Sequence, residues 1–124
     1  MVAGSARIRT GKAGEELAAA YLRQAGYEIL ERNYRCPFGE VDIVACEGGT
    51  IVFVEVKCRR STHFGEPEMA VGWQKQRKIS RISLHYLQER NHLSCAARFD
   101  VVAVKMRGEE VHIELIKDAF ALAP

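Results

Sequence analysis

Hydrophobic residues recur at two different spacings along this chain, and the change between them marks the predicted elements. Helical spacing over 12–25 and again over 68–88 predicts two amphipathic helices. Shorter runs, rich in β-branched residues, predict strands. These runs cover 27–34, 41–46, 50–58, 99–104 and 111–116. The order α-β-β-β-α-β-β favours an α/β fold, in which helices flank a central mixed sheet.

The segments outside these elements are short. Residues 1–11 lack an apolar run and predict a mobile arm, whereas 61–67 carry a glycine and a proline and predict a loop. Residues 118–124 form a tail able to dock on the domain. Because the chain has 124 residues, 48% of them hydrophobic, and no internal repeat, we expect a single domain over 1–124.

Composition narrows the class of protein. No run reaches the roughly 18 apolar residues of a membrane helix, and the N-terminal residues lack the apolar stretch of a secretory signal. We therefore expect a soluble, cytoplasmic protein without a membrane partner. The cysteines have no CxxC spacing, which favours free thiols in a reducing cytoplasm over a zinc site or a disulfide. They stand at positions 36, 46, 58 and 95.

The net charge of +2 is too small to indicate a nucleic-acid partner, but its distribution is uneven. Between positions 57 and 81 the acidic residues are Glu66 and Glu68, against seven basic ones. The basic residues are Lys57, Arg59, Arg60, Lys75, Arg77, Lys78 and Arg81. Such a run is either an ordinary solvated face or a surface that follows a phosphate backbone.

Carboxylates lie inside the predicted hairpin of the second and third strands. If Gly48-Gly49 forms a two-residue turn, Asp42 faces Glu55 and Glu40 faces Lys57, with all four side chains on one face. Opposed carboxylates about 5 Å apart repel by roughly 3 kcal/mol at an effective dielectric constant near 20. Because an ordinary cross-strand pair contributes only about 0.2–1 kcal/mol, stability alone does not explain this pair.

A shared proton, a nearby cation or a bound divalent metal would relieve this repulsion. Oxygen ligands suit Mg²⁺ or Mn²⁺, so we expect Asp42 and Glu55 to hold one of these ions. Lys57 follows Glu55 by two residues, where its ammonium group could orient or deprotonate a water or hold a phosphate oxygen. The alternative is an exposed sheet face on which Lys57 bridges Glu40 and Glu55.

Asp42 followed by Glu55-Val56-Lys57 resembles the Asp...(Asp/Glu)-x-Lys site of the restriction-endonuclease-like superfamily. Longer strings resemble the YraN family of small bacterial proteins, which are themselves similar to archaeal Holliday-junction resolvases. These strings are GKAGEELAAAYL, GYEILERNYR, GEVDIVA, VFVEVKCR, AVGWQKQRKI and RFDVVAV. The resemblance covers about residues 11–120, nearly the whole chain.

The resemblance implies a restriction-endonuclease-like α-β-β-β-α-β core, divalent-metal hydrolysis of phosphodiesters, and a homodimer as in the resolvase relatives. The pattern places the metal ligands at Asp42 and Glu55, with Glu15 completing the shell directly or through water. It places the catalytic lysine at Lys57. Glu15 also lies in the first turns of the first predicted helix, where the helix dipole favours a carboxylate without any chemistry.

Lys75 falls on the apolar stripe of the second predicted helix, together with Ile79 and Ile82. It either snorkels to solvent or reaches the carboxylates or a substrate phosphate. Lys78 and Arg81 lie on an adjacent face, so this helix could follow a nucleic-acid backbone.

The remaining candidates are assigned structural roles. Trp73 and Tyr86 are expected in the core, with stacking on bases as the alternative, and Arg98 and Asp100 are expected to form an ion pair. The histidines have no ligand spacing and are expected at the surface. They are His63, His85, His92 and His112.

The sequence therefore favours a metal-dependent endonuclease that hydrolyses phosphodiester bonds of structured or branched nucleic acid, DNA in preference to RNA. The residues expected to bind the backbone are Arg59, Arg60, Lys75, Lys78 and Arg81. One alternative is a nucleic-acid-binding module that keeps the nuclease fold without cleaving. Another is a protein-interaction subunit whose carboxylates merely bind a stabilising metal.

Overall fold

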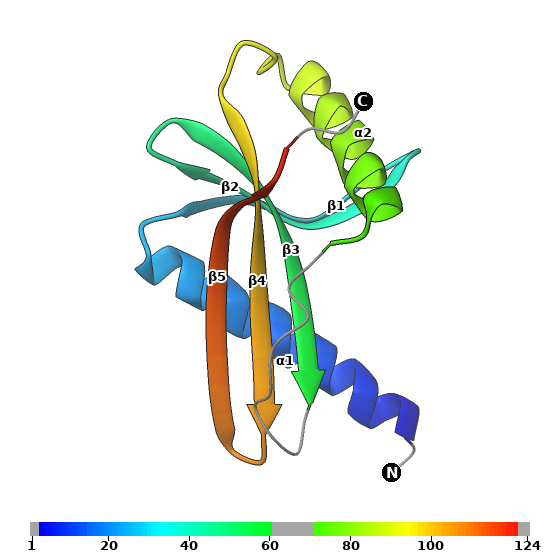
Figure 1. Cartoon of the computed structure of the whole chain (residues 1–124), viewed down its shortest axis with the longest axis vertical. Coiled ribbons are helices and arrows are strands. Elements are labelled where there is room, and N and C mark those ends of the chain that lie inside the picture. Colours follow the sequence, from blue (N-terminus) through cyan, green and yellow to red (C-terminus); the bar gives the residue numbers. More distant parts are fainter. Residues whose placement is uncertain (1–2, 61–70, 122–124) are drawn as a thin grey trace.

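The chain forms a twisted sheet with a helix on each face (Figure 1). The structure, a computed structural model, describes residues 3–60 and 71–121, with side chains from Lys12 onward. Within these residues the elements are α1 (Ala3–Gln24), β1 (Glu28–Cys36), β2 (Gly39–Glu47), β3 (Thr50–Arg60), α2 (Trp73–Glu89), β4 (Ala97–Arg107) and β5 (Glu110–Phe120). The predicted α/β class and order of elements are confirmed, and both are compatible with a restriction-endonuclease-like core.

The strands lie in the spatial order β1-β2-β3-β4-β5. Only β3 and β4 run parallel among the described strands, and the other neighbours pair antiparallel. A parallel pair needs a crossover connection, and α2 lies in that connection. The sheet is therefore mixed, with β3 at its centre, paired with β2 on one side and β4 on the other.

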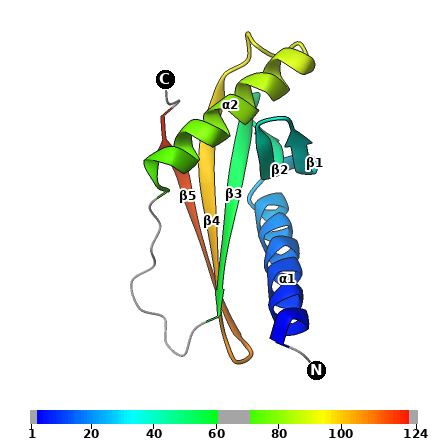
Figure 2. The same cartoon turned by 90° about the vertical axis from the view of Figure 1, so that its right-hand side faces the viewer.

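The two helices cover opposite faces of the sheet (Figure 2). On one face Leu22 of α1 packs with Val54 and Val102, in a cluster that includes further β-branched residues of β2 to β4. On the other face Ile82 of α2 packs with Phe53 in a second cluster. Both faces are covered, which explains why the central strands read as nearly continuous apolar runs.

The ends of the elements differ from the predicted ends. Helix α1 begins at Ala3 and thus includes most of the segment that was predicted to be an arm; no proline interrupts it. Strand β5 continues to Phe120, whose ring stacks on Phe99 with centroids 4.7 Å apart, so the first part of the predicted tail joins the sheet. The predicted loop at 61–67 and the start of the predicted helix at 68 lie outside the described residues.

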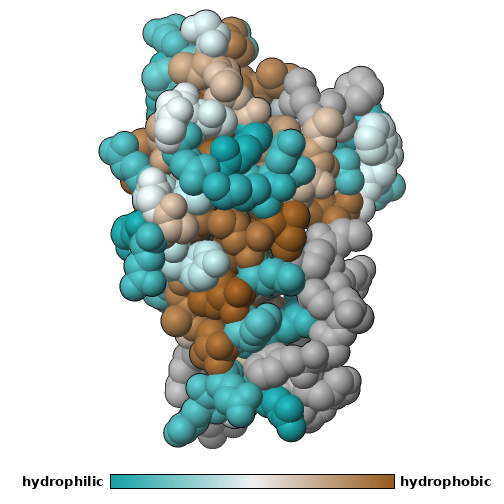
Figure 3. Space-filling view, turned by 60° about the vertical axis from the view of Figure 1, so that its left-hand side comes forward, coloured by the Kyte–Doolittle hydropathy of each residue, from teal (hydrophilic) through white to brown (hydrophobic). Residues whose placement is uncertain are grey.

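Strand β5 is an edge of the sheet, and Figure 3 shows the molecule from the side on which β5 lies in Figure 1. Hydrophobic residues gather in the middle of this face, with hydrophilic residues above and below. An apolar cleft of about 320 Å³ also lies between α2 and the adjoining parts of β4 and β5. Its lining includes Leu84, Leu87, Phe99 and Phe120.

Gly14 allows α1 to approach β3 closely. A Cβ atom at this position would lie 2.5 Å from the Sγ atom and 2.9 Å from the Cβ atom of Cys58. Since the Cβ atom of Cys58 is fixed to the strand, Gly14→Ala should push α1 away from the sheet and lower the free energy of unfolding by about 1–3 kcal/mol. Urea unfolding at equilibrium measures this change.

Gly72→Ala is the matched control. Gly72 has a φ of −62°, and a Cβ atom added there would meet no heavy atom within 4 Å beyond its chain neighbours. Its replacement should therefore lower stability only by the roughly 0.5–1 kcal/mol by which alanine is less favourable than glycine at the N-cap of a helix. Equal effects of the two substitutions would contradict the close approach at Gly14.

Candidate functional site

The predicted register of the β2–β3 hairpin is confirmed. Glu47 pairs with Thr50, and the ladder continues regularly to Ile43 paired with Val54. Gly48 and Gly49 have φ values of +55° and +84°, the left-handed conformations that a tight two-residue turn requires. The turn therefore sets which residues of the two strands meet.

The two strands separate just beyond this ladder. Oδ2 of Asp42 accepts a hydrogen bond of 2.7 Å from the backbone N–H of Val56, which a continued ladder would direct to a β2 carbonyl. Val41 and Val44 pack on the α2 side while Ile43 packs on the α1 side, so the strict alternation breaks at Asp42. The carboxylate of Asp42 thus lies between the strands.

This separation corrects two predictions. Asp42 and Glu55 do not form a pair in the regular ladder, because β2 leaves β3 at this point. Glu40 does not face Lys57; it pairs across β1, with its Oε2 atom 2.8 Å from Nε of Arg35. The alternative in which Lys57 bridges Glu40 and Glu55 loses its geometric basis.

Electrostatic coupling shows that the carboxylates still lie near one another. Burial raises the pKa of Asp42, and burial together with the charge of Asp42 raises the pKa of Glu55. Burial and then the charge of Asp42 also raise the pKa of Glu15 on α1. Asp42 therefore interacts with one carboxylate from β3 and one from α1, as its position between the strands permits.

Lys75 reaches this group from the first turn of α2. Its Nζ atom lies 3.2 Å from Oε1 of Glu55, so contact with the carboxylates is the observed one of the alternatives that the sequence left open, although 47% of the side chain remains exposed. The charge of Lys75 lowers the pKa values of Asp42 and Glu55 but does not cancel the effect of burial. Lys57 also lowers the pKa of Glu55, which places a second ammonium within electrostatic range.

Glu15 lines a cleft of about 440 Å³ between α1 and β1, all of whose lining residues are polar or charged. Lys12, Glu16, Arg32 and Asn33 complete its lining. Nη1 of Arg32 lies 2.7 Å from Oε1 of Glu16, whereas Glu15 responds mainly to burial and Asp42. Of the two adjacent glutamates, Glu15 is therefore the one coupled to the carboxylates of the sheet.

The donor set fits a hard divalent cation. No three His, Cys, Asp or Glu side chains within the described ranges converge as a ready metal-binding group. Mg²⁺, however, is commonly held by only one or two protein carboxylates, with water and substrate phosphate as its other ligands. Asp42 and Glu55 could provide those two carboxylates. Burial raises the pKa of both, and the charge of Asp42 further raises the pKa of Glu55, so a bound cation would favour their charged forms.

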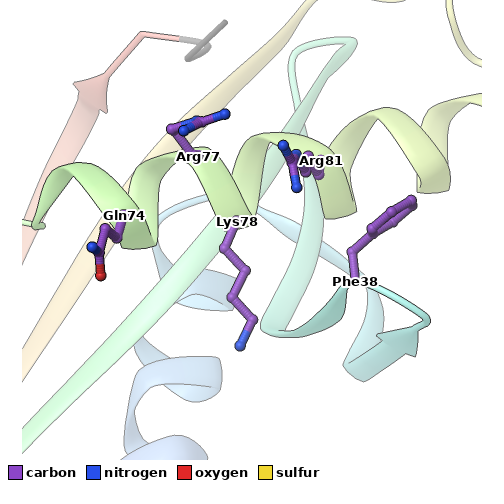
Figure 4. Close-up of a pocket in the computed structure, with 5 residues that line it drawn as sticks. All are labelled: Phe38, Gln74, Arg77, Lys78 and Arg81. Atoms are coloured by element: carbon purple, nitrogen blue, oxygen red, sulfur yellow. The ribbon is translucent and has the colours of Figure 1, made fainter.

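The residues predicted to bind a backbone separate into three places. Lys78 and Arg81 line a cleft of about 210 Å³ on α2, together with Gln74, Arg77 and Phe38 (Figure 4). Lys75 lies at the carboxylates. Arg59 and Arg60 end β3 and are exposed.

Three residues that line the α2 cleft were not among the binding residues selected from the sequence: Phe38, Gln74 and Arg77. Arg77 stood in the basic run without a distinguishing feature. Phe38 forms the turn between β1 and β2 with Pro37, and a large aromatic residue in a two-residue turn is the signal that could have identified it.

The outcome of the structural assignments is mixed. Trp73 is 56% exposed, so its prediction as a core residue was wrong; it begins α2 before the buried stripe starts. Tyr86 is buried as expected. The ion pair between Arg98 and Asp100 is confirmed at 3.0 Å, and Tyr27 donates a 2.7 Å hydrogen bond to Asp100.

The cysteines and histidines can also be placed. All four cysteines lie in the described part of the chain, and none of them forms a disulfide. His112 is exposed as expected, while His85 and His92 are partly buried. His63 lies outside the described residues. Neither helix in the described ranges is long and apolar enough to cross a membrane.

The fold and the site together define an α/β protein with a mixed sheet and an acidic centre where β2 and β3 separate. The chain belongs to the uncharacterised protein family UPF0102, whose family model matches residues 14–104. The resemblance to the YraN family is thereby confirmed.

Relatives of the same family align over most of their own length. A UPF0102 protein of Syntrophus aciditrophicus is 64% identical over 116 residues, covering 94% of this chain and 91% of the relative. A UPF0102 protein of Caldicellulosiruptor saccharolyticus is 52% identical, covering 89% and 95%. A third, from Geobacter metallireducens, is 51% identical, covering 91% and 93%.

Proposed function

We propose that this protein is a metal-dependent endonuclease that hydrolyses phosphodiester bonds in structured or branched DNA. The observation that carries the proposal is the meeting of two partly buried carboxylates, Asp42 and Glu55, with a lysine from each of two elements. A protein selected only for stability has no reason to place them there, since burial penalises both charged carboxylates.

The residues of the centre have distinct roles in this proposal. Bound Mg²⁺ or Mn²⁺ would polarise the scissile phosphate and lower the pKa of a water molecule. Asp42, oriented by the N–H of Val56, and Glu55, oriented by Lys75, would hold the ion. Lys57 positions the attacking water or stabilises charge on the phosphate, and Glu15 assists from α1 through water.

The basic residues supply the binding of the backbone. Lys78 and Arg81 lie on the exposed side of α2, and Arg59 and Arg60 lie at the end of β3, beyond the carboxylates along the chain. Contacts of this kind position a nucleic acid without reading its sequence. Recognition of DNA structure, such as a junction, a flap or a branched end, therefore suits this surface better than recognition of a base sequence.

A non-cleaving nucleic-acid-binding module is the second candidate. The contact of 3.2 Å between Lys75 and Glu55 favours this candidate, because the protein's own ammonium group then takes part of the place of the metal ion that catalysis needs. In this case the basic surface would bind nucleic acid while the centre remained inert.

We also propose a cytoplasmic location and a homodimer. The cysteines, all within the described ranges, form no disulfide, which suits a reducing compartment. The exposed Leu84 and the apolar cleft beside it form a surface that a second copy of the chain could cover.

Cleavage of a panel of labelled DNAs tests the proposed function. The panel contains duplex, nicked, single-stranded, flapped and four-way branched DNA, each incubated with Mg²⁺, Mn²⁺ or EDTA. We expect cleavage of branched forms with Mn²⁺ or Mg²⁺ and none with EDTA. Metal-dependent cleavage supports the endonuclease; tight binding without cleavage under every condition supports the second candidate instead.

A further inference from the structure

Phe38 occupies an unusual place for a large apolar side chain. Strands β1 and β2 are joined by the two-residue turn Pro37–Phe38, with Cys36 paired to Gly39. Phe38 is 48% exposed. A single exposed apolar residue needs no explanation by itself. Whether Phe38 has a binding role therefore has to be judged from the residues around it.

Phe38 shares its cleft with three cations of α2. Arg77, Lys78 and Arg81 line the same cleft as Phe38, and Gln74 completes it (Figure 4). In the described part of the chain the lining contains no carboxylate to neutralise them. Arg77 and Arg81 are four residues apart on one helix, where like charges destabilise the helix by roughly 0.2–0.5 kcal/mol. The cluster therefore opposes helix stability and suits an anionic ligand.

The turn and the helix are held against each other. A Cβ atom at Gly39 would lie 2.5 Å from Cε of Lys78 and 3.3 Å from Cδ1 of Ile82. The aliphatic stem of Lys78 thus passes directly over the backbone next to Phe38. The ring of Phe38 also meets His85 edge to face, with centroids 5.9 Å apart. Because its neighbours hold the ring in place, stacking a ligand on it costs little conformational entropy.

The size of the cleft limits its ligand. At about 210 Å³ it is smaller than the roughly 300–1,000 Å³ of sites that enclose a small molecule. It can accept one part of an extended polymer, such as a phosphate and the base attached to it. An aromatic face beside cations is the combination by which proteins bind nucleic acid through stacked, unpaired bases.

We propose that Phe38 stacks on an unpaired base, while Lys78 and Arg81 bind the phosphates on either side of that base. The ligand is DNA in which single-stranded nucleotides adjoin a duplex. This inference rests on the proposed function and deepens it, because the cleft would select a branch point or a frayed end rather than continuous duplex. A paired base within a duplex is stacked on both faces and cannot offer one to Phe38.

Binding measured in EDTA tests the stacking without any cleavage. One probe is a duplex with a single-stranded extension that carries 2-aminopurine at the junction, and the other is a fully paired duplex of equal length. Phe38→Ala should weaken binding of the extended probe about 5- to 150-fold and remove the fluorescence change of the 2-aminopurine. Binding of the paired duplex should change less than about twofold, and Phe38→Trp should restore both signals.

Leu93→Ala is the matched control, because Leu93 is also a large exposed apolar residue, outside the cleft. It should behave as wild type. Thermal unfolding of each variant verifies that it is folded. An equal loss of affinity for both probes, or no loss for either, would overturn the stacking role of Phe38.

The two proposals can fail separately. If wild type cleaves branched DNA with Mn²⁺ but Phe38→Ala binds the extended probe as tightly as wild type, the endonuclease stands and the stacking site falls. If wild type shows a Phe38-dependent fluorescence change but cleaves nothing with any metal, the stacking site stands and the endonuclease falls. Absence of binding to every probe would overturn both.

Discussion

Asp42→Asn is expected to lower the rate of DNA cleavage about 100- to 1,000-fold. A metal ion bound at a scissile phosphate stabilises the transition state by several kcal/mol, and each 1.36 kcal/mol corresponds to a factor of ten in rate. Asparagine keeps the shape of the side chain and can still accept the N–H of Val56, but it lacks the charge that holds the cation. Single-turnover cleavage of the best substrate with Mn²⁺ measures the loss.

Stability distinguishes this loss from misfolding. The pKa of Asp42 is raised in the folded protein, so the folded state disfavours its charged form. An aspartate in the unfolded chain has a pKa of 3.8. As the pH rises from this value through the higher pKa of Asp42 in the folded protein, the free energy of unfolding of the wild type falls, whereas that of a variant with neutral asparagine at position 42 does not. In EDTA at pH 7, Asp42→Asn should therefore be at least as stable as wild type.

Added metal provides a readout besides activity. Mg²⁺ should raise the melting temperature of wild type, because a ligand that binds only the folded state stabilises it, and should have little effect on Asp42→Asn. Cleavage by the variant at the wild-type rate would show that Asp42 has no catalytic role. A melting temperature far below that of wild type would show instead that the carboxylate is needed for folding.

Lys57→Ala is expected to lower the cleavage rate about 100-fold or more while leaving metal binding nearly unchanged. General acid–base catalysis or positioning of a water typically contributes about 100- to 10,000-fold. Lys57 lies within electrostatic range of Glu55, but its chemistry acts on the water or the phosphate rather than on the ion. The cleavage rate and the Mg²⁺-dependent rise in melting temperature, measured on one preparation, separate these two effects.

Lys117→Ala serves as the control for the removal of a lysine. Lys117 lies on β5 and pairs with Glu47 at the hairpin end, with Nζ 3.0 Å from Oε2. Its replacement should leave the cleavage rate within about twofold of wild type. If Lys57→Ala also cleaves at the wild-type rate, Lys57 has no catalytic role and Lys75 becomes the candidate.

The β2–β3 hairpin shows which features of the structure can be predicted from local sequence patterns. The runs of β-branched residues and Gly48-Gly49 predict both strands and their register, because turn length and side-chain alternation are local properties. The pattern could not predict where the strands separate. That point depends on the carboxylate of Asp42 replacing a ladder hydrogen bond at Val56.

The helices show the same limit. Apolar spacing predicted that α2 packs on the sheet through Ile79 and Ile82, and it placed Lys75 on the same stripe. Whether Lys75 turns to solvent or to Glu55 depends on the position of the helix relative to the sheet, and only the packed structure supplies it. The exposure of Trp73 was missed because the stripe begins later than the helix does.

By itself the sequence determined the class of fold, the order of the elements and the hairpin register as far as Ile43 and Val54, and it proposed the residues of the acidic centre. Each of these follows from the spacing of side chains within one or two neighbouring elements, or from a resemblance carried by short strings. The tertiary structure alone decided that Asp42 lies between β2 and β3, that Lys75 meets Glu55, and that Phe38 joins the cations of α2. These contacts join segments distant along the chain, and their geometry depends on how the helices pack against a twisted sheet.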